Sequence, residues 1–457
     1  MGKYPIKHTV LLIFLTLIGI GCENKSPTKS KEENDLFKPD YIPLTENIVM
    51  YEVNIRAFSR AGTFQGVIDR LDSIKALGIN TIWLMPIYPI GVKNSVNSPY
   101  CIKNYTEINP EFGVLDDFLT LVSEAHEKNM AVIIDWVANH TAWDNPWITN
   151  KSWYTQDEDG IIIYPAGTNW QDVADLNYSN QDMRKEMIKS MKYWIETADI
   201  DGFRCDAADY VPYNFWAQAI DSLYTIGKYL ILLSEGSRND HFTAGFQMNY
   251  GWDFYYNLVN VFNDDYSVTT IYNTHNTEYK NIPEGKHKLR FTTNHDESAW
   301  NETPVILFNG KKGALAASVI TIFLGGVPLI YGSQEVGVPG TISFFENDPI
   351  DWTLNPDMLK SYHDILTVYN SSEIFRTGSL TTYSDANISI FKRTAGTEEY
   401  LIIVNTRNRN ISVNTPSDLI NTSWSDVFND TEVQFSQTIT LNPYEYLIFK
   451  AEIITTK

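Results

Sequence analysis

Four apolar segments of this 457-residue chain each end in polar residues that could do acid–base chemistry. They end in DWVANH at 135–140, RCD at 204–206, the single acid Glu235, and NHD at 294–296. An isolated aspartate at a strand end is more often the N-cap of the next helix, but caps explain poorly four clusters that also hold an arginine and two histidines. Carboxylates at close range raise one another's pKa values, so one can carry a proton beside an ionised neighbour. Cleavage of a glycosidic bond requires such a pair.

The elements that must position these clusters read as alternating strands and helices. Seven apolar runs and a weaker one near 246–252 predict strands buried on both faces; the seven are NIVMYEVNI, NTIWLMPIY, AVIIDWVAN, DGFRCD, YLILLSEG, KLRFTTN and VPLIYGS. Helical spacing of apolar residues lies between them, at 64–74, 118–125, 181–199, 211–227, 311–324 and 356–369. Eight strands that each lead into a helix predict an α/β fold, the (β/α)8 TIM barrel, whose strand C-termini converge on one face. A doubly wound sheet is the structural alternative.

The same patterns divide the chain into domains. We assign the barrel to 45–375 and a short inserted subdomain to 141–180, because that interval after the third strand is too long for an ordinary loop. Aromatic residues are dense in the insert, where they could stack on sugar rings or form the insert's own core; they are Trp143, Trp147, Trp153, Tyr154, Tyr164 and Trp170. Short alternating segments over 376–457 predict a C-terminal all-β sandwich domain.

The N-terminus reads as an export signal. Lys3 and Lys7 precede an apolar run at 9–20, and Cys22 follows small residues, which resembles a bacterial lipoprotein signal peptide at 1–22. We therefore expect Cys22 to be lipidated and the protein to be exported and anchored to a bacterial membrane by lipid alone. Gly19 stands where such signals usually have leucine, so ordinary cleavage with a chance cysteine is the alternative. The polar segment 23–44 predicts a flexible linker.

Composition excludes some classes of function. With 35 Lys+Arg against 56 Asp+Glu the net charge is −21, which argues against nucleic acid as a partner because phosphates are bound mainly by Lys and Arg. A hydrophobic content of 43% is typical of a folded globular protein. Three cysteines cannot form a disulfide framework. Nothing in the sequence indicates an oligomeric state.

Four ordered motifs resemble those of a known enzyme family. DWVANH, GFRCD, the strand ending at Glu235 and TTNHD are similar, in order and spacing, to the four signature regions of the α-amylase family of glycoside hydrolases, family 13. Three supporting stretches agree with that family: SPYCIKNYTEINPEFG at 98–113, DVADLN at 172–177 and GGVPLIYGSQEVG at 325–337. The resemblance covers about 47–450.

This resemblance implies a retaining α-glucan hydrolase. It makes Asp206 the nucleophile, Glu235 the general acid/base and Asp296 the carboxylate that stabilises the transition state. The implied substrates are starch, maltodextrin or related α-glucans, cleaved mainly at α-1,4 bonds.

The resemblance also assigns binding residues. Arg204 would hold Asp206 ionised, since a guanidinium favours the charged carboxylate. His140 and His295 would donate hydrogen bonds to sugar hydroxyls, Tyr100 would stack beneath the sugar ring, and Asp135 would support that subsite.

Two further positions match calcium ligands of family members. They are Asn139 and Asp175, whose oxygen atoms suit a hard cation, so a structural calcium ion is implied. The implied chemistry needs no organic cofactor.

Departures from the family leave the substrate open. Many α-amylases have a Lys-His pair three and four residues after the nucleophile, where this chain has Asp209 and Tyr210. Endo-acting amylase, neopullulanase-like and α-glucosidase-like activities therefore stay open. Transglycosylation and a non-catalytic glucan-binding role are the alternatives to hydrolysis.

Overall fold

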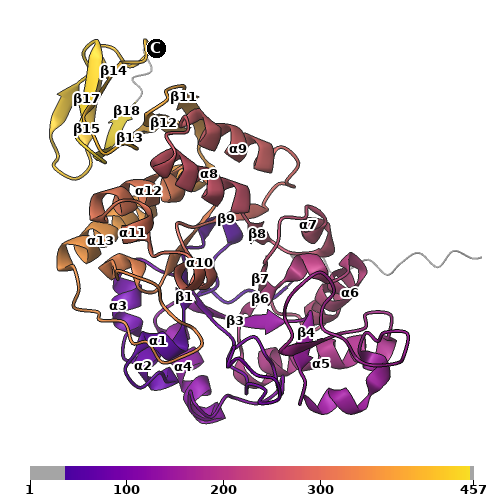
Figure 1. The fold of residues 1–457 in the computed structure, drawn as a ribbon. Helices are drawn as coiled ribbons and strands as arrows, with labels where there is room; N and C mark the ends of the chain where they lie inside the picture. The colour runs from indigo at the N-terminus through magenta and orange to yellow at the C-terminus, as the bar shows by residue number, and fades with distance from the viewer. Residues whose placement is uncertain (1–35, 453–457) are drawn as a thin grey trace, which may run out of the picture.

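The computed structural model describes residues 36–452 (Figure 1). The predicted signal peptide, Cys22 and the first part of the predicted linker lie outside the described residues. Among residues 36–452 no helix combines the length and apolar character that a membrane span requires.

Eight parallel strands close into a barrel, which confirms the predicted fold class. Neighbours around the barrel follow the order β1-β10-β9-β8-β7-β6-β3-β2, and β1 also pairs with β2. The weakly marked strand is β8, only three residues long. The strands are β1 (Met50–Val53), β2 (Thr81–Leu84), β3 (Ala131–Val137), β6 (Gly202–Asp206), β7 (Ile231–Ser234), β8 (Met248–Tyr250), β9 (His287–Arg290) and β10 (Val327–Tyr331).

Alternate side chains of each barrel strand point to opposite sides of the sheet. Both sides are buried, one in the barrel interior and the other beneath the helices. Ile133 and Leu233 pack in the cluster that fills the barrel interior, whereas Ile134 and Leu232 pack against the surrounding helices. The absence of an exposed face on these described strands explains why they read as continuous apolar runs.

Helices surround the barrel (Figure 1). They are α1 (Ile55–Phe58), α2 (Phe64–Ile68), α3 (Leu71–Ala76), α4 (Leu115–Glu127), α5 (Gln181–Ala198), α6 (Tyr213–Tyr224), α7 (Asp240–Ala244), α8 (Trp252–Asn263), α9 (Thr269–Tyr279), α10 (His295–Trp300), α11 (Pro304–Leu307), α12 (Lys311–Phe323), α13 (Pro356–Asn370) and α14 (Ile374–Thr377). The side chains of α12 are buried from Gly313 to its end, and this helix contacts α8, α13 and the C-terminal sheet. An all-round apolar helix is the expected result of such a position.

Residues 36–44, which the sequence places in a linker, pack at the N-terminal ends of the barrel strands. Leu36 and Ile42 are buried and join the interior cluster. The backbone of Phe37 donates to Gly227 O and accepts from Tyr229 N, each at 2.8 Å. This segment therefore closes the bottom of the barrel.

The long interval after β3 forms a small subdomain of its own. It contains a two-stranded antiparallel sheet of β4 (His140–Ala142) and β5 (Val173–Asp175), with the 3-10 turns Pro146–Thr149 and Lys151–Trp153. Tyr154 is buried, and Trp143, Trp147 and Trp153 pack against the main core. Most of the predicted aromatic residues of the insert thus serve packing rather than an open surface.

The C-terminal part is an antiparallel sandwich, as predicted. Six strands form one sheet in the order β11-β12-β13-β18-β15-β16, and β14 pairs with β17 in a second sheet. The strands are β11 (Ser379–Tyr383), β12 (Ile388–Ala395), β13 (Glu398–Asn405), β14 (Ile411–Asn414), β15 (Ser423–Asp426), β16 (Glu432–Gln434), β17 (Thr438–Leu441) and β18 (Tyr446–Glu452).

The larger of the two sheets also packs on the barrel. Ile390 faces the apolar core shared with β17, whereas its neighbour Phe391 joins the core of the barrel domain. Polar contacts cross the same junction: Arg407 donates to the carbonyls of Val261 and Tyr266, and Tyr272 contacts Ser389. The two parts are therefore joined through a packed interface.

Candidate active site

A cavity of about 730 Å³ opens where the barrel strands end. Its lining includes six of the residues that the sequence singles out as substrate-contacting or catalytic: Tyr100, His140, Asp206, Glu235, His295 and Asp296. Arg204 and Asp135 are fully buried and contact this group from within the barrel. The structure therefore brings together all the predicted catalytic and sugar-binding residues.

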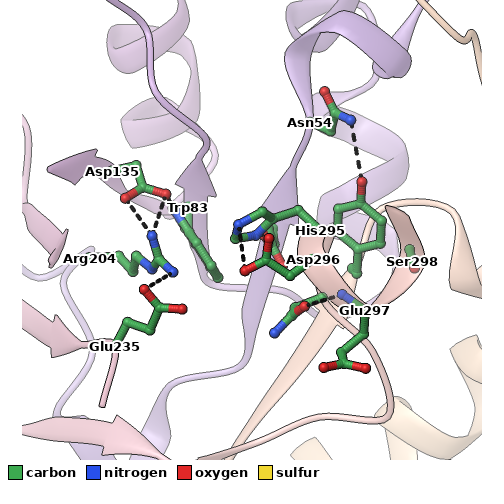
Figure 2. Close-up of polar contacts among 12 residues, drawn as sticks. Asn54, Trp83, Asp135, Arg204, Glu235, His295, Asp296, Glu297 and Ser298 are labelled. Atoms are coloured by element: carbon green, nitrogen blue, oxygen red, sulfur yellow. Dashed lines mark hydrogen bonds and ion pairs between the residues drawn. The ribbon is translucent and has the colours of Figure 1, made fainter. Parts of the chain in front are cut away.

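One guanidinium contacts three carboxylates at the centre of the site, two of which, Asp135 and Glu235, are seen beside it in Figure 2. Arg204 Nη1 contacts Asp135 Oδ1 at 2.8 Å and Asp206 Oδ1 at 2.9 Å. Its Nη2 contacts Glu235 Oε2 at 2.9 Å. Strand register produces this arrangement, because Arg204 pairs with Asp135 on the neighbouring strand and shares the inner face of β6 with Asp206, two residues on.

Three aromatic side chains fix Asp135. Trp83 Nε1 donates to Asp135 Oδ2 at 3.2 Å, and the Tyr100 hydroxyl donates to the same oxygen at 3.0 Å. Tyr88 donates to its main-chain carbonyl at 3.0 Å. Asp135 is thereby held where it can orient Arg204 without facing the cavity.

Glu235 is held by the segment that follows Asp206. The backbone N–H of Ala207 donates to Glu235 Oε2 at 2.7 Å, and that of Ala208 donates to Glu235 O at 2.9 Å. Glu235 N in turn donates to Cys205 O at 2.9 Å. The two carboxyl-bearing strand ends, at Asp206 and Glu235, are therefore tied to each other by backbone hydrogen bonds.

Burial and mutual repulsion raise the pKa values of Asp206, Asp135 and Asp296. Burial raises the pKa of Asp206 well above its ordinary value, the Glu235 charge raises it further, and Arg204 opposes the rise. Burial raises the pKa of Asp135 to about 6 against the effect of Arg204, and burial with the Glu235 charge raises the pKa of Asp296 to about 7. One buried cation among four carboxylates leaves negative charge in excess, so the group retains a proton near neutral pH.

His295 leads to a residue that sequence reasoning missed. Its Nδ1 contacts Glu52 Oε1 at 2.5 Å, and its Nε2 contacts the Tyr100 hydroxyl at 2.7 Å. Because Tyr100 donates its own proton to Asp135, Nε2 must donate to Tyr100, and one proton is shared between Nδ1 and Glu52. Glu52 is fully buried, and the only signal for it is a carboxylate inside an apolar strand segment.

Asp296 and His140 reach the cavity from two other elements. Asn294 caps α10 by accepting from Glu297 N at 2.9 Å, and Asp296 then lies in the first turn with Oδ2 3.4 Å from His295 Nε2 (Figure 2). Burial lowers the pKa of His140 to about 4. The Asn139 amide donates to His140 Nδ1 at 3.2 Å, which leaves the proton of the neutral ring on Nε2.

Aromatic rings form the rim of the cavity. Trp170 and Tyr210 lie 5.6 Å apart on one side, and only Trp170 comes from the set predicted in the insert. Trp300, Phe344 and Phe345 line another part, with Phe344 and Phe345 stacked at 4.4 Å. These three were missed, because they lie in a short helix and an irregular loop that carry no sequence motif.

The predicted calcium ligands lie beside the cavity. Asp175 ends β5 and pairs in register with His140, the residue after Asn139. Burial raises the pKa of Asp175, which has no ion pair with any described residue. In the described part of the chain, no three His, Cys, Asp or Glu side chains are grouped so that they could bind a metal. Asn139 and Asp175 therefore fit two of the six to eight oxygen ligands that calcium takes, and main-chain carbonyls or water would have to supply the others.

Comparisons with known proteins agree with this geometry. Residues 28–160 and 150–249 match the family model described as "Alpha amylase, catalytic domain". The chain is 29% identical over 418 residues to Alpha-amylase 3 of Dictyoglomus thermophilum, which covers 80% of this chain and 77% of that one. It is 27% identical over 434 residues to an intracellular maltogenic amylase of Bacillus subtilis, and the match covers 85% of this chain and 70% of that one. The crystal structure of a maltogenic alpha-amylase from Thermotoga neapolitana superposes with a TM-score of 0.81 at 29% identity, covering 90% of this chain and 100% of that one.

Proposed function

We propose, on the premise that this chain belongs to the alpha-amylase family, that it is a retaining glycoside hydrolase that cleaves α-glucosidic, mainly α-1,4, bonds in starch, maltodextrin or related α-glucans. The observation that carries the proposal is the contact of one buried guanidinium, Arg204, with three carboxylates at the floor of the cavity. Such a cluster supplies a proton donor and an ionised carboxylate side by side, which two-step glycoside hydrolysis uses.

In the first step Asp206 attacks the anomeric carbon while Glu235 gives its proton to the departing glycosidic oxygen. Arg204 opposes the rise in the pKa of Asp206 that burial and the Glu235 charge cause, and so favours the ionised carboxylate that attacks. Asp296, on the cavity wall, stabilises the positive charge that develops on the sugar ring. Glu235 then acts as base on a water molecule, which releases the sugar with its α configuration retained.

His140 and Tyr100 position the sugar that is cleaved. His140 keeps its proton on Nε2 and offers it to a sugar hydroxyl, since Asn139 donates to the other ring nitrogen. Tyr100 lines the cavity with its ring stacked 5.3 Å from that of His295, and is placed to pack on the sugar face.

Product analysis tests this function. The wild-type enzyme is expected to release reducing sugar from soluble starch, and proton NMR of fresh product should show the α-anomer first. Asp206→Asn should abolish this release while oligosaccharide binding persists, because the aromatic and histidine contacts remain. A β-anomer appearing first, or no release of sugar from starch, maltotriose or pullulan, would contradict the proposal. Longer products formed from maltotriose would instead indicate transglycosylation.

We also propose a structural calcium ion held in part by Asn139 and Asp175. Such an ion would supply the positive charge that the partly buried Asp175 carboxylate lacks and would brace the insert against β3. Chelation with EDTA should lower Tm, and added calcium should restore it. A Tm that is unchanged by EDTA would contradict a bound ion.

We propose, finally, that the protein is exported and anchored through lipid on Cys22, which rests on the N-terminal sequence alone. Multiple acyl chains are needed for stable anchoring, because a single chain of myristate size binds only marginally. Wild-type protein should partition with membranes, and Cys22→Ala should not. A wholly soluble wild-type protein without lipid by mass spectrometry would contradict the anchor.

A further inference from the structure

We propose that Asp209 is a positioning residue that sets the aim of the general acid, Glu235, by fixing the backbone of the loop that follows it. This inference rests on the proposed function and adds to it a role for the position at which this chain departs from its family.

The Asp209 carboxylate is bound by the main chain rather than left open to a sugar. Its Oδ2 accepts from Ser237 N at 3.0 Å, and its Oδ1 accepts from Arg238 N at 3.3 Å. Both amides belong to residues just after Glu235. Although Asp209 lines the cavity, its two oxygens are directed to the loop that leaves β7.

Asp209 completes a continuous set of contacts between two chain segments. The segments run from Cys205 to Asp209 and from Glu235 to Arg238, and the hydrogen bonds of Ala207 and Ala208 to Glu235 join their first halves. Arg238 adds a side-chain bond, since its Nη1 donates to Asp209 O at 2.9 Å. Without the Asp209 carboxylate, the amides of Ser237 and Arg238 would lose their acceptors, and the Arg238 side chain would be left as the tie on this side of Glu235.

Gly236, the residue after Glu235, allows the Asp209 carboxylate to lie close to the loop. A Cβ at Gly236 would lie 2.5 Å from Asp209 Oδ1, closer than such contacts occur. His241, fully buried, approaches the same oxygen with Nε2 at 3.4 Å. The carboxylate is thus contacted by Gly236, His241 and the two amides on one side, while its other side faces the cavity.

The arrangement has a consequence for the leaving-group side of the cavity. Many α-amylases have a lysine where this chain has Asp209, and that lysine helps hold the departing sugar. Here the side chain is committed to the loop, and the groups next to it on the rim are the rings of Tyr210 and Trp170. Asp209 therefore acts on the reaction through Glu235 rather than through contact with the departing sugar.

Leaving-group dependence tests this role. A displaced acid should hinder substrates that need a proton on the departing oxygen more than substrates that do not. We expect Asp209→Ala to lower kcat/KM for maltoheptaose by up to about 10²-fold, the scale set by misplacing a catalytic group by an ångström. The loss for a 4-nitrophenyl α-maltoside, whose leaving group departs with little protonation, should be at least several-fold smaller. Asp209→Asn keeps one acceptor oxygen and should fall between Asp209→Ala and wild type.

A matched control is available in the C-terminal sandwich. Asp426 Oδ1 accepts from two successive amides, Phe428 N at 2.8 Å and Asn429 N at 3.2 Å, far along the chain from the cavity. Asp426→Ala removes the same kind of contact and should leave both kcat/KM values unchanged per folded molecule. Equal losses of kcat/KM on the two substrates in Asp209→Ala would overturn the inference. If the alanine variant does not fold, equal losses in Asp209→Asn would do the same. An inactive wild-type enzyme would overturn the proposed function and this inference with it.

Discussion

Strand β6 has a buried aspartate at each end, and the two ends differ in how their charge is balanced. Asp201, just before the strand, contacts Lys228 Nζ at 2.9 Å and His126 Nε2 at 2.8 Å, and accepts from Val132 N at 2.7 Å. Asp206, at the other end, shares one guanidinium with Asp135 and Glu235. Both aspartates are buried, so burial alone does not mark the functional end. An excess of carboxylates over cations marks it, because neighbouring negative charges add to the effect of burial in raising the affinity for protons.

Removing the proposed acid, Glu235, should give the largest effect, which we expect on catalysis and not on stability. Glu235→Gln preserves shape but cannot donate a proton, so kcat/KM for starch oligosaccharides should fall by about 10²–10⁴-fold. The unfolding free energy should change little, because the new amide side chain keeps an oxygen that can accept from Ala207 N. Steady-state kinetics with a parallel thermal melt measures both. A variant that keeps more than a tenth of wild-type activity on starch would contradict the acid assignment.

Disrupting the ion pairs of Asp201, at the end of β6 away from the cavity, should lower stability and leave catalysis unchanged. Asp201→Asn removes the charge that faces Lys228 and His126, and breaking a buried pair costs about 3–5 kcal/mol of unfolding free energy. Lys228 retains Asp199, whose Oδ1 lies 2.6 Å away, so the loss should lie at the lower end of that range. Urea unfolding measures the loss. A fall in kcat at 25 °C for the folded variant would show that the two ends of the strand are coupled.

A smaller effect is expected from Glu52, which belongs to the cavity end but touches no substrate. Glu52→Gln replaces a charge-assisted hydrogen bond to His295 by a neutral one, a difference of about 1 kcal/mol or roughly 5- to 10-fold in kcat/KM. The pH profile should shift as well, since the proton shared by Glu52 and His295 is lost. An unchanged rate and profile would show that His295 needs no partner on β1.

The smallest effect is a pH dependence of stability at the cavity end. Asp296 has a pKa of about 7 in the folded protein, above its ordinary 3.8, because of burial and the Glu235 charge. Between about pH 4 and 7 the folded state therefore binds protons that the unfolded chain has released, and stability decreases as the pH rises through that window. Tm should fall from pH 5 to 7.5 in wild type and fall less in Asp296→Asn. Identical slopes in both proteins would contradict the raised pKa.

The sequence predicted the barrel because both faces of its strands are buried and leave unbroken apolar runs. The shortest strand, β8, gave the weakest signal. It also predicted which residues meet in the cavity, since all but Tyr100 lie in motifs at strand ends, and Tyr100 lies in a stretch that resembles the family. Their catalytic roles, the domain boundaries, the calcium ion and the lipid stay predictions.

Contacts between distant parts of the chain explain what the sequence did not reveal. Glu52 lies 243 positions from His295, and neither residue signals the other. Phe344 and Phe345 form part of the rim from an irregular loop without periodicity. Residues 36–44 read as linker because they continue the polar run that begins at 23 and carry no strand or helix period, and only the open end of the barrel gives Leu36 and Ile42 a place to pack.

The segment that closes the bottom of the barrel also determines how the enzyme would face its surroundings. Leu36 enters the fold at the N-terminal ends of the strands, opposite the cavity at their C-terminal ends. Thirteen residues separate it from Cys22, a span of at most about 50 Å when fully extended. An enzyme anchored at Cys22 would therefore hold its barrel base toward the lipid surface and its cavity outward, where long polysaccharides can enter without crossing the membrane headgroups.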